Sequence, residues 1–239
     1  MKERATESPD AAGEEIAQLV DRTRGEEVLF AAVMRRYNQR LYRIARVILR
    51  DDGEAEDVLQ DAYLRAFENL VQLQDPARFL TWISRIVVHE AWKRLRRRKQ
   101  QASLAPSVAE AALRLHTSVP DPEEEMAQKQ QRAFLEAAID ALPIGYRAVF
   151  MMRDLEGMSV AETAACLGIQ EGAVKTRLHR AHAALREEVW QLMGDPGTQP
   201  FRFDGARCDR IVACVLRCIP PSLPDPRRRR WPKMRATLR

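Results

Sequence analysis

Residues 159–180 read SVAETAACLGIQEGAVKTRLHR and give the clearest indication of how the C-terminal half of the chain folds. Ser159 and Glu162 have the spacing of a capping box, in which the hydroxyl and the carboxylate each accept a hydrogen bond from a free amide at a helix start. Gly168 suits the backbone conformation of a tight turn, and Val174 lies on the buried stripe of a second helix. We therefore predict a helix-turn-helix.

The second of these helices carries polar and basic side chains on the face opposite Val174. In DNA-binding proteins of this type, the second helix enters the major groove and its exposed side chains contact the DNA. The residues expected at base edges are Glu171, Lys175, Thr176 and His179, and those expected at phosphates are Arg177 and Arg180. The alternative is a helical hairpin with a solvated charged face. The coincidence of capping box, turn glycine and basic second helix favours DNA binding.

Three segments nearer the N-terminus repeat apolar residues at spacings of three and four, which is the period of an α-helix. The first runs from Phe30 to Ile48. The second follows a break at Asp51-Asp52-Gly53, and its acidic start suits the positive end of the helix dipole. The third is built on residues 79–87 and runs into a basic segment at 93–99. Short connections between these helices predict one compact bundle.

Between these helical parts, residues 100–122 are rich in Ala, Ser and Pro and predict a linker. Beyond residue 192 a Gly- and Pro-containing tail follows, in which residues 211–219 could form one short helix and residues from 220 onward are expected to be disordered. The predicted fold is all-α: two small helical domains (25–99 and 123–192), a flexible linker (100–122) and a partly disordered C-terminal extension (193–239).

Composition narrows the class of protein. The net charge is +5, from 39 basic and 34 acidic residues, but the charges are segregated along the chain. No run approaches the ~18 apolar residues of a membrane helix, so we expect a cytoplasmic protein without membrane insertion. No nucleophile–base pair, phosphate loop or metal-ligand spacing is found, so we expect no enzyme activity, no cofactor and no metal site.

The cysteines at 166, 208, 214 and 218 lack the paired CxxC spacing of a zinc site. Reduced thiols are expected in a cytosolic protein. Cys214 and Cys218 lie four residues apart and share a face if a helix forms there. A redox or metal switch that also uses Cys208 is one interpretation, and small side chains that pack a short helix are the other.

An aromatic helix leads directly into the basic segment. Residues 93–99 read KRLRRRK, in which six of seven side chains are basic, and such a run suits phosphate contact with salt-dependent affinity. Trp82, His89 and Trp92 could stack on unpaired bases. A basic run is often only a solvated helix end, however, and Trp82 also suits a core position.

Taken together, the two domains resemble the sigma factors of the extracytoplasmic function (ECF) group, in the sigma-70 superfamily. Residues 55–67, AEDVLQDAYLRAF, match the helix by which that family binds the clamp coiled coil of the largest polymerase subunit. Residues 79–98 match the stretch that melts and reads the minus-10 promoter element. Residues 123–190 look like the domain that reads the minus-35 element.

The resemblance implies a set of contact residues for each target, with the helix-turn-helix residues named above at the minus-35 element. The residues implied for core polymerase are Asp57, Gln60, Asp61, Leu64 and Phe67, with Leu64 outside the apolar stripe of its helix. The residues implied for the minus-10 element are Arg78, Trp82, Arg85, His89, Lys93, Arg96 and Arg97. The sequence departs from the family at His89, where asparagine is usual, and at Glu90, Trp92 and Lys93.

The implied function is promoter recognition and opening by a protein that catalyses nothing itself. The implied partners are core RNA polymerase, through its clamp coiled coil and flap, promoter DNA, and an anti-sigma factor. The alternative is a stand-alone helix-turn-helix regulator that binds an operator without polymerase. Such a regulator would normally use its first domain for an effector pocket or a dimer interface, whereas this one pairs an acidic helix with an aromatic and basic one.

Overall fold

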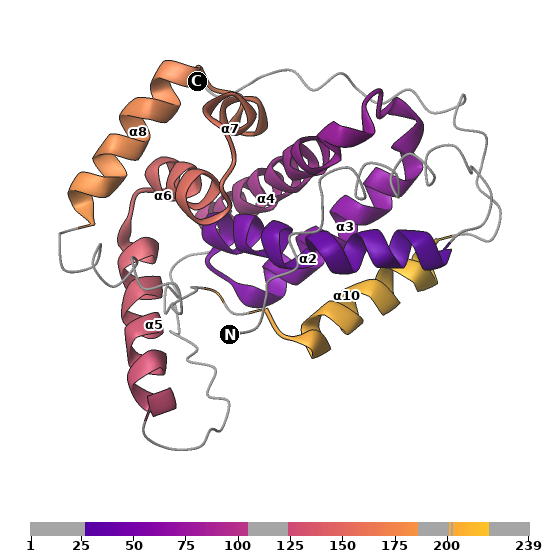
Figure 1. Cartoon of the computed structure of the whole chain (residues 1–239), viewed down its shortest axis with the longest axis horizontal. Helices are drawn as coiled ribbons and strands as arrows, with labels where there is room; N and C mark the ends of the chain where they lie inside the picture. The colour runs from indigo at the N-terminus through magenta and orange to yellow at the C-terminus, as the bar shows by residue number, and fades with distance from the viewer. Residues whose placement is uncertain (1–26, 105–123, 186–200, 202, 220–239) are drawn as a thin grey trace, which may run out of the picture.

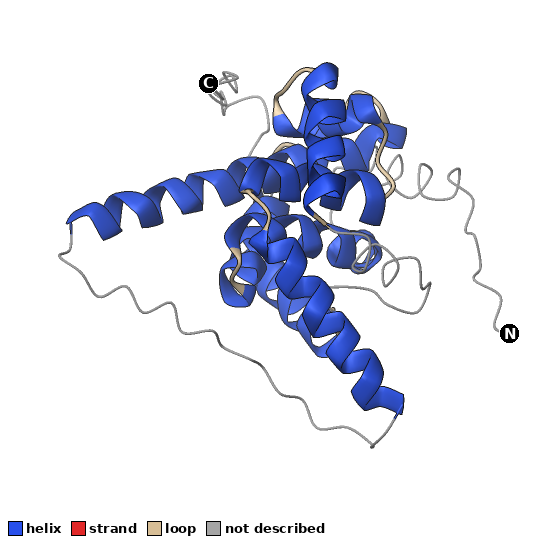
Figure 2. Ribbon diagram, turned by 90° about the vertical axis from the view of Figure 1, so that its left-hand side faces the viewer, coloured by secondary structure: helices blue, strands red, loops and turns tan. Residues whose placement is uncertain are grey.

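The structure, a computed structural model, describes residues 27–104, 124–185, 201 and 203–219 (Figure 1). All regular structure in these ranges is helical, which confirms the predicted fold class (Figure 2). The helices are α2 (Glu27–Leu49), α3 (Asp52–Glu68), α4 (Phe79–Leu104), α5 (Glu124–Ala141), α6 (Ile144–Phe150), α7 (Val160–Leu167), α8 (Glu171–Ala184) and α10 (Gly205–Cys218), with short helical turns η1 (Leu70–Gln72), η2 (Pro76–Arg78) and η3 (Met151–Leu155). Within the described ranges, no helix has the length and apolar character needed to cross a bilayer.

Helices α2, α3 and α4 pack against one another and form what we call the N-terminal bundle. Arg50 adopts a left-handed backbone conformation (φ 58°) directly after α2. Asp51 then caps α3 by accepting a hydrogen bond from the Glu54 amide at 2.7 Å. Phe30 and Tyr63 meet edge to face in the core, with ring centroids 6.0 Å apart. Helix α4 continues to Leu104, beyond the predicted domain end at residue 99.

Helices α6 and α7 both pack on α8 and, with α5, which leads into α6, form what we call the C-terminal bundle. The predicted capping box is present: the Ser159 hydroxyl accepts from the Glu162 amide at 3.1 Å, and the Glu162 carboxylate accepts from the Ser159 amide at 2.7 Å. Gly168 ends α7 in the left-handed conformation (φ 65°), where a Cβ would be strained. Val174, on the inner side of α8, is fully buried. The helix-turn-helix is therefore confirmed.

The two bundles pack together: α6 and η3 contact α2, and α7 contacts α4 (Figure 1). Arg147 of α6 is 4% exposed and donates hydrogen bonds to the Val47 carbonyl in α2 and to the Asp140 and Leu142 carbonyls at the end of α5. Burial lowers the pKa of this guanidinium to about 10. The predicted linker is helical as far as residue 104, and its remainder lies outside the described residues.

A second polar contact between the bundles centres on Glu156, which is buried. Its carboxylate pairs with Arg40 at 3.1 Å and with Arg43 at 3.5 Å, both on α2. Burial raises the pKa of the Glu156 carboxyl, although both arginines act in the opposite direction. The contact surface therefore includes buried charges as well as apolar side chains.

Helix α10, in the predicted C-terminal extension, packs on α2 and α3 (Figure 1). It begins at Gly205 because Asp204 caps it, accepting from the Arg207 amide at 2.7 Å, and it is therefore longer than the predicted helix at 211–219. The helix buries one side, which carries Ile211, Val212 and Val215. The predicted disorder from residue 220 onward concerns residues outside those described.

Candidate functional site

Helix α8 lies at the outer edge of the molecule, away from α3 and α10 (Figure 1). Five of its six predicted DNA-contact residues are exposed: Glu171, Lys175, Thr176, His179 and Arg180. The sixth, Arg177, is half-buried, with its guanidinium beside Gly145 of α6, where a Cβ would come within 3.4 Å of it. The structure thus groups five of the predicted residues on one accessible surface and turns Arg177 toward its own bundle.

Several contacts hold α8 in place. Ala181 and Val174 are fully buried on its inner side. Arg180 donates to the Tyr146 hydroxyl of α6 at 3.2 Å, and His182 contacts the Asp154 carboxylate. A helix fixed to its bundle in this way presents its exposed side chains in a defined register, as base-edge contact requires.

Helix α4 carries the predicted minus-10 residues. Arg78, which ends η2, and Arg85, Arg96 and Arg97 are exposed, whereas Trp82, His89 and Lys93 are half-buried. Trp82 packs on the Phe79 ring at a centroid distance of 5.9 Å, so part of the indole belongs to the core. Burial, with smaller contributions from nearby cations, lowers the pKa of His89, so its imidazole is neutral at pH 7.

Glu90 explains one departure of this sequence from the family pattern. Its carboxylate is 5% exposed, forms an ion pair with Arg65 of α3, and lies 3.6 Å from the Lys93 ammonium. The spacing of Glu90 and Lys93, one helical turn, was a signal for the second of these pairs. Lys93 therefore has an ion-pair partner within α4, and its contact with DNA stays a prediction.

The basic segment is divided between two neighbours. Arg94 pairs with Asp57 at 2.7 Å and Arg98 pairs with Glu54 at 3.3 Å, so one side of the segment anchors α4 to α3. Arg96 and Arg97 point outward and are exposed. The ion pairs of Arg94 and Arg98 with α3 were not predicted from the sequence, and the phosphate contact expected for Arg96 and Arg97 stays a prediction.

The predicted polymerase face of α3 is only partly open. Asp57 and Asp61 are exposed, whereas Gln60, Leu64 and Phe67 are half-buried. Leu64 packs against the core, so the expectation that it stands outside the apolar stripe is wrong. Phe67 lies against the Phe30 ring at 5.0 Å.

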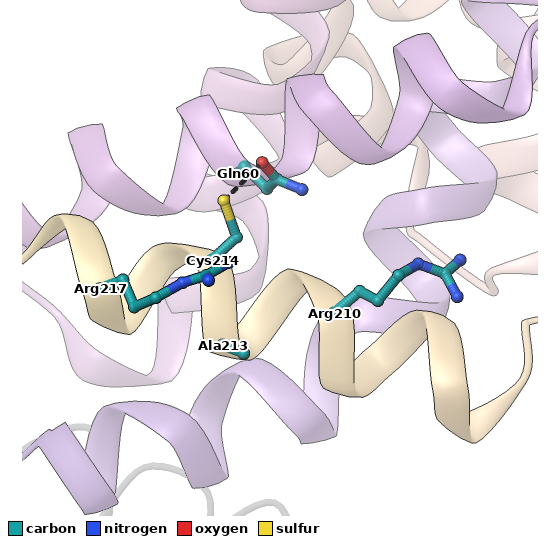
Figure 3. A pocket seen from close by; sticks show the side chains of 5 residues that line it. All are labelled: Gln60, Arg210, Ala213, Cys214 and Arg217. Atoms are coloured by element: carbon teal, nitrogen blue, oxygen red, sulfur yellow. Dashed lines mark hydrogen bonds between the residues drawn. The ribbon is translucent and has the colours of Figure 1, made fainter.

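Gln60 contacts the C-terminal extension. The Cys214 thiol of α10 donates to its amide oxygen at 3.0 Å, and an open groove beside this contact is lined by Gln60, Arg210, Ala213, Cys214 and Arg217 (Figure 3).

All four cysteines are free thiols. Burial raises the pKa of Cys166 to about 12. Among the described residues, no three His, Cys, Asp or Glu side chains are grouped as a metal site would require.

Helices α4 and α7 meet near the start of the aromatic segment. The Thr81 hydroxyl donates to the Glu162 carboxylate at 3.2 Å, and the Cys166 thiol lies 3.5 Å from the Thr81 carbonyl. Farther along α4, Trp92 lines a groove shared with Leu167 and with Ile169 of the turn. The flank of the aromatic helix is therefore covered by the first helix of the helix-turn-helix.

Comparisons with known proteins agree with this arrangement. The family model described as Sigma-70 region 2 matches residues 33–101, in the N-terminal bundle, and that described as Sigma-70, region 4 matches residues 132–185, in the C-terminal bundle. The ECF RNA polymerase sigma factor SigM of Mycobacterium tuberculosis is 35% identical over 161 residues, which cover 67% of this chain and 77% of SigM. SigW of Bacillus subtilis is 30% identical over 174 residues, 71% of this chain and 93% of SigW.

Solved structures show the same fold. CnrH, in complex with the cytosolic domain of CnrY, is 26% identical with a TM-score of 0.50 and matches 78% of this chain and 99% of its own. The sigma factor RpoE, in complex with the anti-sigma factor NepR from Bartonella quintana, has a TM-score of 0.51 at 19% identity over 72% of this chain and 96% of its own. From the matching regions, their order and the extent of the relatives covered, this chain belongs to the ECF RNA polymerase sigma factors of the sigma-70 family.

Proposed function

We propose that this sigma factor brings core RNA polymerase to its promoters through three surfaces, on α8, α4 and α3. The observation that carries the proposal is the separation of charge among them: the exposed contact residues are mainly basic on α8 and α4, and acidic on α3. Basic surfaces suit phosphates, whereas an acidic helix face repels DNA and suits a protein partner. The family assignment favours this function over a stand-alone regulator, and no enzyme activity is proposed.

At the minus-35 element, α8 enters the major groove. Lys175 and His179 lie one turn apart on its exposed side and contact base edges, with Glu171 and Thr176 beside them. The Thr176 hydroxyl already donates to the Gly172 carbonyl at 3.0 Å, which leaves its oxygen as an acceptor. Arg180 binds a phosphate. Arg177 contacts a phosphate only after its guanidinium leaves its position beside Gly145 of α6.

At the minus-10 element, the exposed side of α4 binds single-stranded DNA. His89 and Trp82 are seven residues apart, and Lys93 follows one turn after His89, so all three share a side of one continuous helix. The partly exposed Trp82 ring and the neutral His89 ring offer stacking surfaces, and Arg78, Arg85, Arg96 and Arg97 offer phosphate contacts. Bases that have left the duplex can make contacts of both kinds.

The acidic face of α3 binds the clamp coiled coil of the largest polymerase subunit, mainly through the exposed Asp61, since the exposed Asp57 is paired with Arg94. The C-terminal bundle contacts the polymerase flap. We also propose an anti-sigma factor as a partner, by analogy with the complexes in which CnrH and RpoE were solved.

The test is charge reversal on α3. Asp61→Lys should weaken the complex with purified core polymerase at least tenfold, measured by co-elution from a sizing column over a concentration series. Glu171→Lys is the matched control, because it places the same charge change on α8, away from α3. Equal co-elution of Asp61→Lys and wild type would contradict the docking assignment.

A further inference from the structure

The first described residue of the C-terminal extension, Phe201, touches both bundles. Its amide donates to the Glu136 carboxylate of α5 at 2.6 Å, and its carbonyl accepts from Arg43 of α2 at 3.5 Å. Its ring is covered by the Arg46 guanidinium, 5.1 Å from the centroid. One residue thus bridges a helix of the N-terminal bundle and a helix of the C-terminal bundle.

Phe201 is held in an unfavourable conformation. Its φ is 54°, in the left-handed region that bulky residues rarely adopt, and it is only 4% exposed. Such a conformation costs about 1–3 kcal/mol and persists where surrounding contacts fix it. The bridging contacts are therefore strong enough to overcome this cost.

Arg46 extends the same junction. Besides covering the Phe201 ring, it pairs with Asp52 of α3 at 2.6 Å and with Asp140 of α5 at 3.3 Å. Burial by itself would raise the pKa of Asp52, but Arg46 and further partners lower it overall, so this carboxylate is charged at neutral pH. The cation is thus shared by both bundles and by the extension.

Helix α10 anchors the extension to the N-terminal bundle. Arg207 pairs with Glu56 at 2.7 Å and lies 4.5 Å from the Tyr42 centroid, and Arg210 pairs with the same Glu56 at 3.0 Å. Phe203 packs on the Tyr42 ring at 5.2 Å. With the buried side chains of α10, these contacts fix one end of the extension while Phe201 reaches the other bundle.

The packed arrangement cannot serve both promoter elements at once. The minus-35 and minus-10 elements are about 25 base pairs apart, or about 85 Å along B-DNA at 3.4 Å per base pair. A compact body of the described residues, 158 in all, has a radius of gyration of about 15 Å, and hence a diameter of about 40 Å. Residues 105–123, 19 in all, reach at most about 65 Å when extended, so the two bundles can separate without unfolding.

We propose that Phe201 and residues 203–219 act as an intramolecular clasp, which binds both bundles and holds the sigma factor closed until polymerase or DNA separates them. The clasp leaves the DNA-binding side of α8 exposed. It therefore limits simultaneous binding of the two elements, and not binding of the minus-35 element alone. The inhibitory consequence rests on the proposed function, whereas the closure itself does not.

The test compares Phe201→Ala with Phe203→Ala in the full chain. Both variants remove one phenyl ring from the extension, but the Phe201 ring covers Arg46, which pairs with both bundles, whereas the Phe203 ring packs on Tyr42 of the N-terminal bundle. The backbone amide of residue 201 remains in Phe201→Ala, so removal of its acceptor on α5 needs a variant of Glu136. Dyes are attached through non-natural amino acids at the exposed positions Gln74 and Gln170, one in each part of the molecule. Single-molecule energy transfer then gives the ratio of closed to open molecules.

Phe201→Ala should lower that ratio at least tenfold, and Phe203→Ala should leave it near the wild-type value. Glu136→Ala, which removes the acceptor on the other side, should act like Phe201→Ala, and far-UV circular dichroism checks that all variants keep their helices. An unchanged ratio in both Phe201→Ala and Glu136→Ala would overturn the clasp, as would equal opening by Phe203→Ala. These outcomes need neither polymerase nor promoter, so they are distinguishable from failure of the proposed function.

A second measurement tests the consequence. Affinity for a promoter fragment with both elements and a premelted minus-10 region should rise with the open fraction, up to tenfold for Phe201→Ala, because only open molecules can occupy both elements. Affinity for a short minus-35 duplex should be unchanged. Equal affinity of wild type and variant for the long fragment, despite opening, would overturn the inhibitory role.

Discussion

Replacing Arg147 by methionine should destabilise the C-terminal bundle and its contact with α2, because this side chain binds the end of α5 and also reaches α2. It donates to one carbonyl of α2 and to two carbonyls at the end of α5. Each hydrogen bond from a charged group contributes about 1.5–3 kcal/mol, or about 4.5–9 kcal/mol for three. Burial lowers the pKa of the Arg147 guanidinium to about 10, and methionine would avoid this burial cost of about 3 kcal/mol.

The net loss expected for Arg147→Met is therefore about 1.5–6 kcal/mol. For a chain of this size, 1 kcal/mol shifts the melting temperature by about 2–4 °C, so the midpoint should fall by at least about 3 °C. Arg147→Lys keeps the charge, but a single ammonium cannot reproduce the planar fork, and an intermediate shift is expected.

Thermal unfolding followed by circular dichroism measures the shift, and hydrogen exchange locates it. Amides at the end of α5 and near Val47 in α2 should exchange faster in the methionine variant. A midpoint within about 1 °C of wild type, with unchanged exchange at both places, would refute this role for Arg147.

Three further predictions concern single side chains. Lys175→Ala should cost about 1–3 kcal/mol of binding free energy on the preferred minus-35 sequence and relax the sequence preference at one base pair. Arg180→Ala should weaken binding to all sequences and reduce the slope of log affinity against log salt concentration by about one. An equal loss of affinity for all sequences in Lys175→Ala would reverse these roles. His89→Ala should fail to open duplex promoters, which permanganate reactivity of the promoter thymines measures, because stacking contacts must offset the cost of unstacking the bases. The variant should recover transcription on a premelted bubble template. Full activity on both templates would remove His89 from the site. Because burial raises the pKa of Glu156 above 4.5, its contribution to stability is present below 4.5 and is lost as pH rises through the folded-state value. The melting temperature of the wild type should therefore fall relative to that of Glu156→Gln as pH rises from 4.5 through the folded-state pKa. Parallel profiles of melting temperature against pH would contradict this.

Much of the local structure could be predicted because its causes are local. Ser159 and Glu162 satisfy amides within one turn, and Gly168 ends a helix by its own backbone freedom. The apolar period of each segment likewise fixes which side of its helix is buried. The helix-turn-helix and the exposed residues of α8 follow from such patterns.

The contacts between the bundles could not be predicted in this way. Arg147 binds backbone carbonyls, which any sequence supplies, and Glu156 meets arginines more than a hundred residues away. Arg177 was expected at DNA because of its charge, but the absence of a side chain at Gly145 lets it lie beside α6.

The extension illustrates the same limit. The apolar pattern of α10 predicts a buried side, but only the fold shows that α2 and α3 cover it and that Phe201 reaches α5. Periodicity identifies a face that needs a partner, and it does not identify the partner.

Run-off transcription with purified core RNA polymerase and a set of genomic promoters from the source organism tests promoter recognition most directly. Addition of the wild-type chain should produce transcripts from a subset of promoters that share minus-35 and minus-10 sequences, and Asp61→Lys should reduce those transcripts at equal concentration. Transcription indistinguishable from that of core polymerase alone, at concentrations where the wild-type chain binds the same promoter fragments, would contradict it.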